Sequence, residues 1–238
     1  MIPIKIRICR KKFTLIELLI VISIIALLAG MLLPALNKAR EKARAAACVN
    51  HFSSLGKAMQ LYTADNQDFI TPYSNENGYT SGRTRMWHFA SSLGLISDYL
   101  QASRGGQIVG YDIIGGKIWK GKFVCPSYVP PAEWVTWSTP RVYSIGLNSY
   151  LPELFNAGRL PKIGRVKKAS GGAHALESRQ GVYIHRYYPL TDASLQAEFR
   201  HSNRTNVVYI DGHVDARNGR EKIFVASDGY KDDFWTIN

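Results

Sequence analysis

Four polar side chains near the C-terminal end of the sequence belong to the types that bind metal ions. His201 precedes the dipeptide Asp211-Gly212, and His213 and Asp215 follow it. Imidazole nitrogens and carboxylate oxygens are zinc ligands, so one interpretation is a metal-binding or enzymatic site built from His201, Asp211, His213 and Asp215. The other interpretation is structural, because Asp-Gly is a preferred sequence for a two-residue type I′ turn between antiparallel strands. We favour the structural interpretation.

Other chemistry is sparse in this sequence. A loose acidic cluster near the C-terminus is an alternative site for calcium, although its spacing is not that of an EF-hand; it consists of Asp228, Asp232 and Asp233. No nucleophile elbow, phosphate-binding loop, zinc motif or dinucleotide fingerprint occurs. We therefore expect no catalytic residues, no assigned metal site and no cofactor, with calcium as the alternative.

Composition and charge exclude several classes of protein. A chain of 238 residues that is 46% hydrophobic is too apolar to be disordered, and three cysteines are too few for a disulfide-stapled mini-protein. The net charge is +12, and its excess comes largely from two basic clusters on either side of one apolar segment, Lys5, Arg7, Arg10, Lys11 and Lys12 before it and Lys38, Arg40, Lys42 and Arg44 after it. Basic residues in such places orient membrane helices and contact lipid headgroups. We expect no nucleic-acid partner.

The apolar segment itself predicts a transmembrane helix. From Leu18 to Leu36 the sequence is LLIVISIIALLAGMLLPAL, without a charged residue. Together with residues 13–16 this is long enough to cross a bilayer, which takes about 20 apolar residues. Few helices of soluble proteins are apolar on every face, and the segment lacks the small-residue cleavage site of a secretory signal peptide.

One ionisable residue, Glu17, lies at the start of this segment. A carboxylate in such a place is costly in lipid and usually has a partner or a role, although the positive end of the helix dipole reduces the cost. The sequence suggests no partner within the same helix. The alternative is that Glu17 merely extends to the membrane interface.

The segment KKFTLIELLIVISIIALLAGMLLPALNKAREKA resembles the N-terminus of type IV pilin-like proteins, in particular the pseudopilins of type II secretion systems. The resemblance implies that a prepilin peptidase removes a basic leader, residues 1–12, by cutting between Lys12 and Phe13. It also implies that the new amino group of Phe13 is methylated and that Glu17 pairs with the amino terminus of a neighbouring subunit. The sequence departs from the family pattern at Lys12, where Gly is usual.

A second resemblance concerns the C-terminal part of the chain. His201, nine intervening residues and Asp211-Gly212 are similar to the H-x9-DG pattern of a pilin-like family, and Cys125-Pro126-Ser127 looks like another of its recurrent segments. After leader removal, which takes Cys9, two cysteines remain in a domain expected on the oxidising side of the membrane. We predict a disulfide between Cys48 and Cys125, with two separate buried thiols as the alternative.

The resemblance implies a structural subunit and not an enzyme. Such a pseudopilin would support protein export as part of a type II secretion-type filament. Its partners would be other pseudopilin subunits, the prepilin peptidase, the inner membrane and the secretion-system platform. The chain would cross the inner membrane once, with its N-terminus cytoplasmic and its C-terminal domain periplasmic or extracellular. Two alternatives stay open. One is a membrane-anchored periplasmic enzyme or metal-binding protein that uses the four polar side chains above; the other, suggested by the positive charge, is a DNA- or surface-binding minor type IV pilin.

The elements that would position these residues follow from the sequence pattern. We predict a transmembrane helix half over 13–36, an amphipathic half over 37–64 and a globular domain over 65–238. Apolar residues recur at helical spacing and predict the face that packs on the domain; they are Cys48, Phe52, Leu55, Met59 and Tyr62. Pro34 falls inside the helix, where its ring clashes with the carbonyl of Gly30, and predicts a kink.

Short segments broken by Gly, Pro and Asn fill the rest of the chain. We predict strands over 108–114 and 117–123, a hairpin of strands 207–210 and 213–216, and a short helix over 87–101. The predicted fold class is α+β, a pilin-like architecture in which one long helix packs on an antiparallel sheet.

Overall fold

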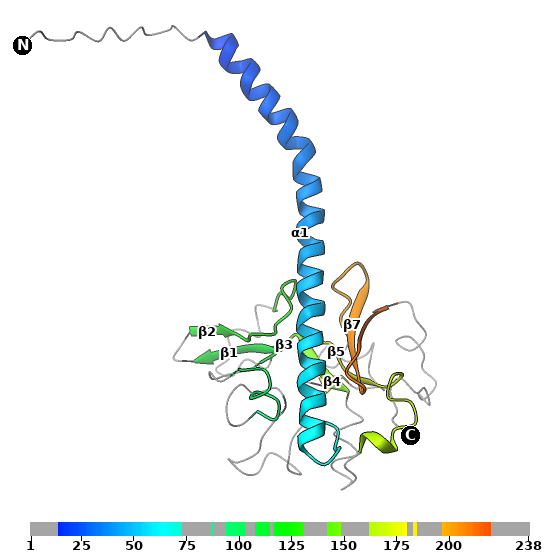
Figure 1. Ribbon diagram of the computed structural model, residues 1–238. Coiled ribbons are helices and arrows are strands. Elements are labelled where there is room, and N and C mark those ends of the chain that lie inside the picture. Colours follow the sequence, from blue (N-terminus) through cyan, green and yellow to red (C-terminus); the bar gives the residue numbers. More distant parts are fainter. Residues whose placement is uncertain are drawn as a thin grey trace, which may run out of the picture. The chain divides into compact units, whose positions relative to one another are not determined.

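The computed structural model describes residues 14–72, 87, 94–102, 108–114, 117–130, 142–148, 162–179, 183–184 and 197–219. Lys12 and Phe13, with the predicted leader, lie outside the described residues, as do the three aspartates of the predicted calcium cluster, Asp228, Asp232 and Asp233. The chain divides into two compact units, Met1–Lys42 and Ala43–Asn238. A single long helix, α1 (Leu15–Asp65), contributes to both (Figure 1).

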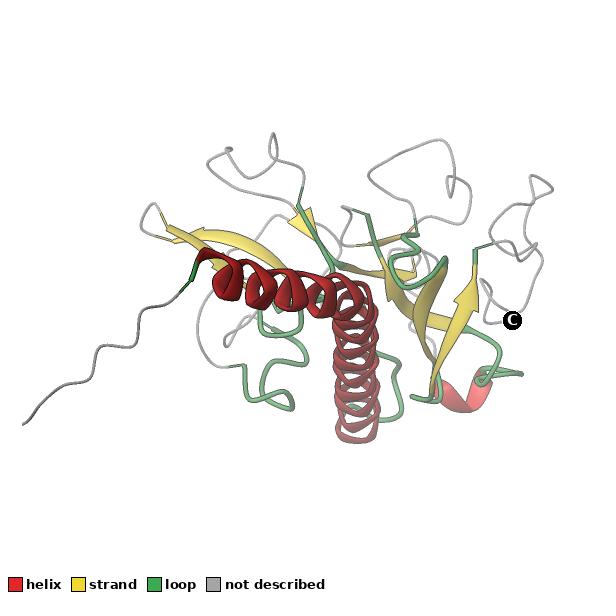
Figure 2. Cartoon of the chain, turned by 90° about the horizontal axis from the view of Figure 1, so that it is seen from above, coloured by secondary structure: helices red, strands yellow, loops and turns green. Residues whose placement is uncertain are grey.

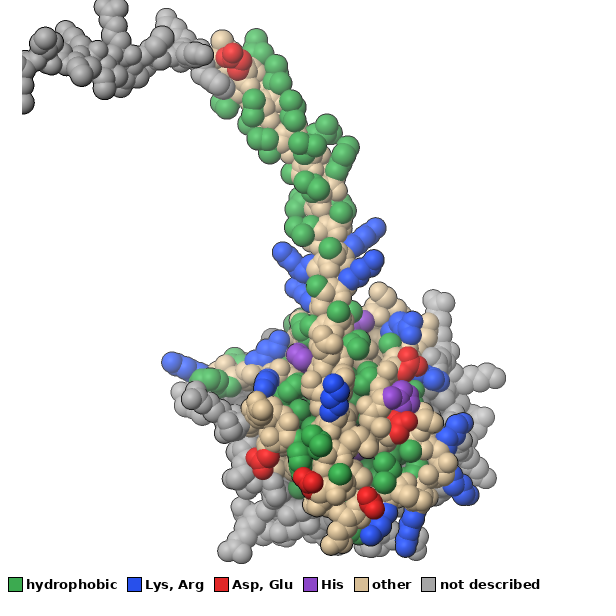
Figure 3. Space-filling view, in the orientation of Figure 1, with side chains coloured by type: hydrophobic (Ala, Val, Ile, Leu, Met, Phe, Trp, Pro, Cys, Tyr) green, Lys and Arg blue, Asp and Glu red, His purple; other side chains and the backbone are tan. Residues whose placement is uncertain are grey.

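In the first unit, α1 exposes the apolar side chains that the sequence assigned to a membrane. Its large hydrophobic residues from Leu15 to Leu36 are about half exposed or more, from 48% for Val21 to 84% for Leu15. The space-filling view shows hydrophobic side chains along this part of the helix and basic side chains where the apolar run ends (Figure 3). Among the described residues this helix is long and apolar enough to cross a membrane.

The helix continues through Pro34 as one element. A β-carbon built on Gly30 would meet no atom within 4 Å, so packing does not require a glycine there. The kink predicted at Gly30 and Pro34 stays a prediction.

In the second unit, the predicted face of α1 is buried. Cys48, Phe52, Leu55 and Met59 are fully buried, and Tyr62 is partly buried against the same core. The spacings of four and three residues place all of these side chains along one stripe of the helix, so the prediction of the packing face is confirmed.

Two sheets complete the second unit (Figure 2). The smaller sheet has the strand order β2-β1-β3, and both of its pairings are antiparallel. The larger has the order β6-β4-β5-β7-β8 and is antiparallel except for the β4–β6 pair. The elements are β1 (Gly110–Ile114), β2 (Lys117–Lys120), β3 (Val142–Tyr143), β4 (Ile145–Asn148), the 3-10 helix η1 (Ile163–Arg165), β5 (Ala173–Glu177), β6 (Tyr183–Ile184), β7 (Arg204–Tyr209) and β8 (Val214–Asn218). The α+β fold class is confirmed.

The core forms where the buried face of α1 meets the larger sheet. Leu147, Ala175 and Val208 share one cluster with the buried residues of α1, whereas Leu176 and Val207 belong to a separate cluster. Neighbouring residues of a strand point to opposite faces of the sheet, which explains this division. The helix therefore covers one face of the five-stranded sheet.

The predicted helix over 87–101 is wrong where the structure describes it. Residues 94–102 form a bridge, bends and turns, with Gln101 at a φ of +50°. A helical hydrogen bond joins Leu100 N–H to Ile96 O at 3.2 Å, but the Ser97 hydroxyl donates to Gly94 O at 3.2 Å. Serine hydroxyls that bond to nearby backbone compete with helix formation.

The Asp-Gly hairpin is present, but its loop is not the two-residue type I′ turn that we predicted. Tyr209 N–H donates to His213 O at 2.9 Å, and Gly212 N–H donates to Tyr209 O at 2.9 Å. The loop therefore contains three residues, of which Gly212 has the positive φ of +86°. A turn followed by a left-handed glycine is the usual three-residue hairpin connection.

Close packing against α1 explains why the loop takes this form. Gln60 Nε2 on α1 donates to Ile210 O at 2.6 Å. A β-carbon on Gly56 would lie 2.5 Å from Gly212 O, and one on Gly212 would lie 2.6 Å from Gln60 Cγ. The glycine of the H-x9-DG pattern therefore lets the hairpin backbone touch the helix.

Candidate functional site

The start of α1 holds Glu17 in a local hydrogen-bonded arrangement. Thr14 donates to Glu17 Oε2 from its backbone N–H and from its hydroxyl, both at 2.8 Å. The backbone N–H of Glu17 donates in return to Thr14 Oγ1 at 3.2 Å. These reciprocal bonds are a capping box, which satisfies backbone donors that a helix start leaves without partners.

The expectation that Glu17 has no partner in its own helix is therefore wrong. The signal was present in the sequence, because Thr-Leu-Ile-Glu fits the capping-box pattern of Ser or Thr followed three residues later by Glu or Gln. Both bonds from Thr14 end on Oε2. A carboxylate accepts about four hydrogen bonds, so acceptor capacity remains for a donor from another molecule.

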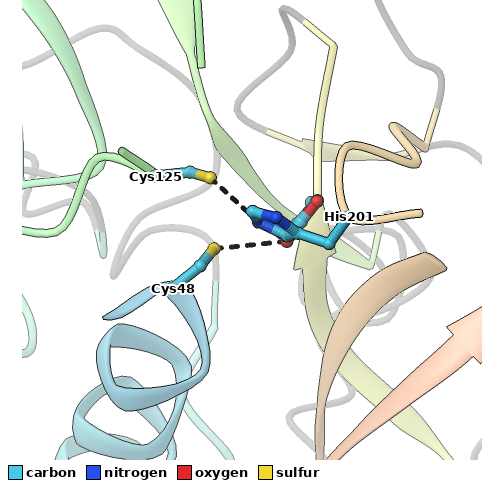
Figure 4. A group of neighbouring side chains, drawn as sticks. Cys48, Cys125 and His201 are labelled. Atoms are coloured by element: carbon cyan, nitrogen blue, oxygen red, sulfur yellow. Dashed lines mark hydrogen bonds and ion pairs between the residues drawn. The ribbon is translucent and has the colours of Figure 1, made fainter. Parts of the chain in front are cut away.

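A second arrangement of polar side chains lies in the core of the second unit. Four segments contribute to it: Cys48 comes from α1, Cys125 from the chain between β2 and β3, Glu177 from the end of β5 and His201 from the turn before β7. His201 is 8% exposed and the other three are fully buried. Figure 4 shows Cys48 and Cys125 directed toward the space occupied by the His201 ring. We call these four residues the core cluster.

The polar atoms of the core cluster converge. The Cys48 thiol donates to Glu177 Oε1 at 3.2 Å, and Cys125 Sγ lies 3.3 Å from His201 Nε2. His201 Nε2 is also 3.5 Å from Glu177 Oε1. One nitrogen, one carboxylate oxygen and two sulfurs therefore lie within 4.8 Å of one another.

Neighbouring groups fix the carboxylate of Glu177. Asn206 Nδ2 donates to Oε1 at 2.7 Å, and Arg200 Nη1 lies 3.6 Å from Oε2. Arg200 is itself held, because its Nη1 donates to Ser144 O at 3.1 Å and its guanidinium lies 4.5 Å from the centre of the Tyr128 ring. A positive charge is therefore placed beside the core cluster, close enough to Cys125 to lower the pKa of that thiol.

Burial and these contacts shift the acidities of the core cluster. Burial raises the pKa of Glu177, and the charge of Arg200 opposes this shift. The neighbouring thiol of Cys125, followed by burial, raises the pKa of Cys48. The neighbouring thiol of Cys48, with smaller contributions from His201 and Arg200, lowers the pKa of Cys125. Cys125 is thus the thiol that ionises first.

The geometry does not fit a catalytic cysteine. In a Cys–His–acid triad the acid orients the histidine through the ring nitrogen that does not face the nucleophile. Here Cys125 and Glu177 both face Nε2 of His201. Reactive cysteines are also partly exposed, whereas Cys125 is fully buried. The four ligand atoms of this arrangement can together coordinate one cation.

The alternative metal-binding or enzymatic site of His201, Asp211, His213 and Asp215 is not formed. Asp211 Oδ1 accepts the His213 N–H at 3.2 Å and lies 2.5 Å from His213 Nδ1, all within the hairpin loop. The His213 ring stacks on Tyr209 at 4.2 Å, and Asp215 accepts the Ala216 N–H at 2.7 Å. In the part of the chain that is described, the converging ligand-type side chains are those of the core cluster, which shares His201 alone with the predicted set.

Comparison with known proteins points to pili. A stretch of 87 residues is 40% identical to the type IV wide pilus major component PilA4 of Thermus thermophilus, and it covers 37% of this chain and 56% of that protein. The chain resembles a type IV pilin. The match therefore spans little more than half the length of this relative. No family model and no solved structure matches the chain.

In this pilin-like chain Cys48 and Cys125 both belong to the core cluster, where they are free thiols. The disulfide between them stays a prediction.

Glu177 was missed by sequence reasoning. The sequence contains a weak indication of Glu177, because it is the one acidic residue of the segment AHALE. In the structure this segment is a strand in which every residue is buried.

Proposed function

We propose that this chain is a membrane-anchored subunit of a pilin-like filament and that it assembles through the N-terminal part of α1. The observation that carries the proposal is the helix of the first unit. Its apolar side chains are exposed, and its first turn contains a glutamate that takes part in a capping box. The capping box accounts for part of the role of that carboxylate, and its remaining acceptor capacity suits a donor from another subunit. Similarity to a pilus major component supports the same conclusion.

The proposed assembly step pairs opposite charges between subunits. Cleavage between Lys12 and Phe13 by a prepilin peptidase would create an amino group on Phe13, methylated in the mature chain, that pairs with Glu17 of a neighbouring subunit. An amine and a carboxylate are each costly in lipid and compensate each other when paired, whereas removal of one leaves the other uncompensated. The capping box would hold the Glu17 side chain in one direction before the neighbour arrives.

Within this class we favour a pseudopilin of a type II secretion-type apparatus, in which a short filament and its platform support protein export across the cell envelope. The chain would cross the inner membrane once, with the second unit on the periplasmic or extracellular side. The second candidate is a subunit of a type IV pilus, because the relative is described as a pilus component. Deletion of the gene separates the two: loss of secreted proteins with surface pili retained supports the pseudopilin, and the converse supports the pilus subunit.

Three variants test the role of Glu17, with filament incorporation measured by crosslinking in native membranes. Glu17→Gln removes the charge but keeps a residue that completes a capping box. Thr14→Ala removes the threonine hydroxyl of the capping box but keeps the charge. Glu17→Ala removes the charge and the carboxylate of the capping box.

We expect Glu17→Gln and Glu17→Ala to reach the membrane in normal amounts but to give no crosslinked multimers, while Thr14→Ala assembles. Normal multimers in Glu17→Gln together with failure of Thr14→Ala would mean that Glu17 serves only to start the helix. Glu41→Gln, a charge change in the same helix outside the apolar segment, is the matched control and should assemble normally.

A further inference from the structure

We propose that the core cluster is a structural zinc site in which Cys48, Cys125, Glu177 and His201 bind one Zn²⁺ tetrahedrally. The inference is independent of filament assembly, because all four residues belong to the second unit. Of its four residues, His201 alone belonged to the alternative metal site that the sequence suggested.

Three of the six distances within the core cluster are close to the edges of a zinc tetrahedron. Zinc bonds of about 2.3 Å to sulfur and about 2.0–2.1 Å to nitrogen or oxygen separate the ligand atoms by roughly 3.3–3.8 Å. The corresponding separations are 3.2 Å for Cys48 Sγ to Glu177 Oε1, 3.3 Å for Cys125 Sγ to His201 Nε2 and 3.5 Å for His201 Nε2 to Glu177 Oε1. No pair of ligand atoms exceeds 4.8 Å, so small side-chain adjustments complete the coordination.

The charges also balance. On binding, the two cysteine thiols release their protons to solvent and become thiolates. Two thiolates and the Glu177 carboxylate carry three negative charges, which Zn²⁺ and the guanidinium of Arg200 neutralise. Arg200 lies 3.6 Å from Glu177 Oε2, whereas the other oxygen, Oε1, accepts from Cys48.

The donor set selects zinc over the other common divalent ions. Thiolates are soft ligands that favour zinc, whereas calcium and magnesium prefer sets made of oxygen. Four protein ligands in a closed core leave no open position for water or substrate, which is the pattern of structural and not catalytic zinc. The hydrogen bond from Asn206 to Glu177 Oε1, at 2.7 Å, is the kind of outer contact that orients a ligating carboxylate.

A zinc ion here would connect parts of the chain that are distant in sequence. Cys48 and Glu177 are separated by 129 residues, and Cys125 and His201 by 76. The ion would therefore tie α1 to the end of β5, to the chain before β3 and to the turn before β7. This turn contains the histidine of the H-x9-DG pattern, which gives that histidine a physical reason for its place.

The competing explanation is the disulfide between Cys48 and Cys125. A disulfide would involve only the two sulfurs. It would remove the thiol proton that Cys48 donates to Glu177 Oε1, and it would leave the fully buried Glu177 carboxylate beside the disulfide. A zinc ion uses all four side chains at once. The geometry therefore favours zinc.

The test uses the full chain, purified in detergent without chelators from cells grown with added zinc. All proteins carry Cys9→Ser, so that Cys48 and Cys125 are the only thiols counted. We expect one zinc per chain by elemental mass spectrometry. After zinc removal, Co²⁺ should give the intense visible bands of tetrahedral cobalt together with thiolate-to-cobalt charge transfer.

Variants sharpen the result. Cys125→Ser and His201→Gln should lose the zinc, and His213→Gln, the matched exposed histidine in the hairpin loop, should retain it. Asn206→Ala keeps all four ligands and should weaken zinc affinity about 10–100-fold in competition with a chelating dye. Because the zinc content and the cobalt spectrum are measured on the protein with its four ligands intact, the test stands even where a ligand variant fails to fold.

Two outcomes would overturn the proposal. One is a protein that contains no zinc, whose two cysteines resist alkylation under denaturing conditions and whose mass is two hydrogens below that of the reduced chain; that result would establish the disulfide. The other is zinc that persists unchanged in Cys125→Ser and His201→Gln, which would place the ion elsewhere.

Discussion

Glu17 and Glu177 are two carboxylates in apolar segments, and the two units of the molecule support them in opposite ways. Glu17 is held by Thr14, three residues away, and its side chain is exposed. Glu177 is fully buried, and its partners Cys48, Asn206 and Arg200 come from three other segments. The first arrangement leaves the carboxylate free to meet another molecule, whereas the second uses it entirely within the domain.

This difference separates two tasks within one chain. Loss of Glu17 should affect contacts between molecules and leave the fold of the second unit intact. Loss of Glu177 should affect the fold of the second unit itself.

The largest effect is expected from Glu177→Ala, which leaves the Arg200 charge and the Asn206 amide in the core without the carboxylate. Removing one member of a buried ion pair costs about 3–5 kcal/mol. Chemical unfolding of the full chain in detergent, followed by tryptophan fluorescence, measures it. Asp215→Asn, an exposed carboxylate in β8, is the control and should unfold like the unchanged protein. A Glu177→Ala protein as stable as this control would remove the distinction between the two glutamates.

A second effect concerns pH, because burial lowers the pKa of His174 to about 4 from its ordinary 6.5. His174 Nε2 lies 3.1 Å from Thr71 O, and Nδ1 is buried without a hydrogen-bond partner among the described residues, so the folded protein holds the neutral ring. As the pH falls below 6.5, His174 becomes protonated in the unfolded chain, whereas in the folded chain it stays neutral until about pH 4. Stability is therefore full above pH 6.5 and falls by about 3 kcal/mol by pH 4.

The measurement is unfolding free energy between pH 7 and pH 4 for the unchanged protein and for His174→Gln, which keeps a side-chain donor for Thr71 O. The variant should lose less stability over this interval. Equal pH slopes in the two proteins would show that His174 does not cause the dependence.

A smaller effect is expected where α1 and the hairpin touch. Gly56→Ala and Gly212→Ala would place β-carbons 2.5 Å from Gly212 O and 2.6 Å from Gln60 Cγ. Overpacking of this kind costs about 1–3 kcal/mol, and Gly212 adds the strain of its positive φ. Gly30→Ala is the matched control, since a β-carbon there meets nothing within 4 Å. Thermal unfolding should show both core variants destabilised and the control unchanged or slightly stabilised.

Local patterns in the sequence predicted α1 and the Asp-Gly hairpin, but they wrongly predicted a helix over 87–101. Periodic apolar residues were sufficient for the buried face of α1, because helical spacing alone aligns Cys48 with Met59. The position of the Asp-Gly hairpin was predicted, but its loop type was not, since contact between Gly56 and Gly212 determines it. The core cluster joins residues up to 129 positions apart, and no spacing rule connects Glu177 to Cys48.

The proposed pairing of Glu17 with a neighbouring subunit needs an amino group on Phe13, so the N-terminus of the mature chain tests it most directly. The protein is extracted from native membranes and cut with cyanogen bromide after Met31, a reaction that does not cleave at Lys12. Mass spectrometry should find a fragment that begins at Phe13 and carries one methyl group. A fragment in which Lys12 is still joined to Phe13 would contradict the account, because the uncut chain has no amine at that position for Glu17 of a neighbour.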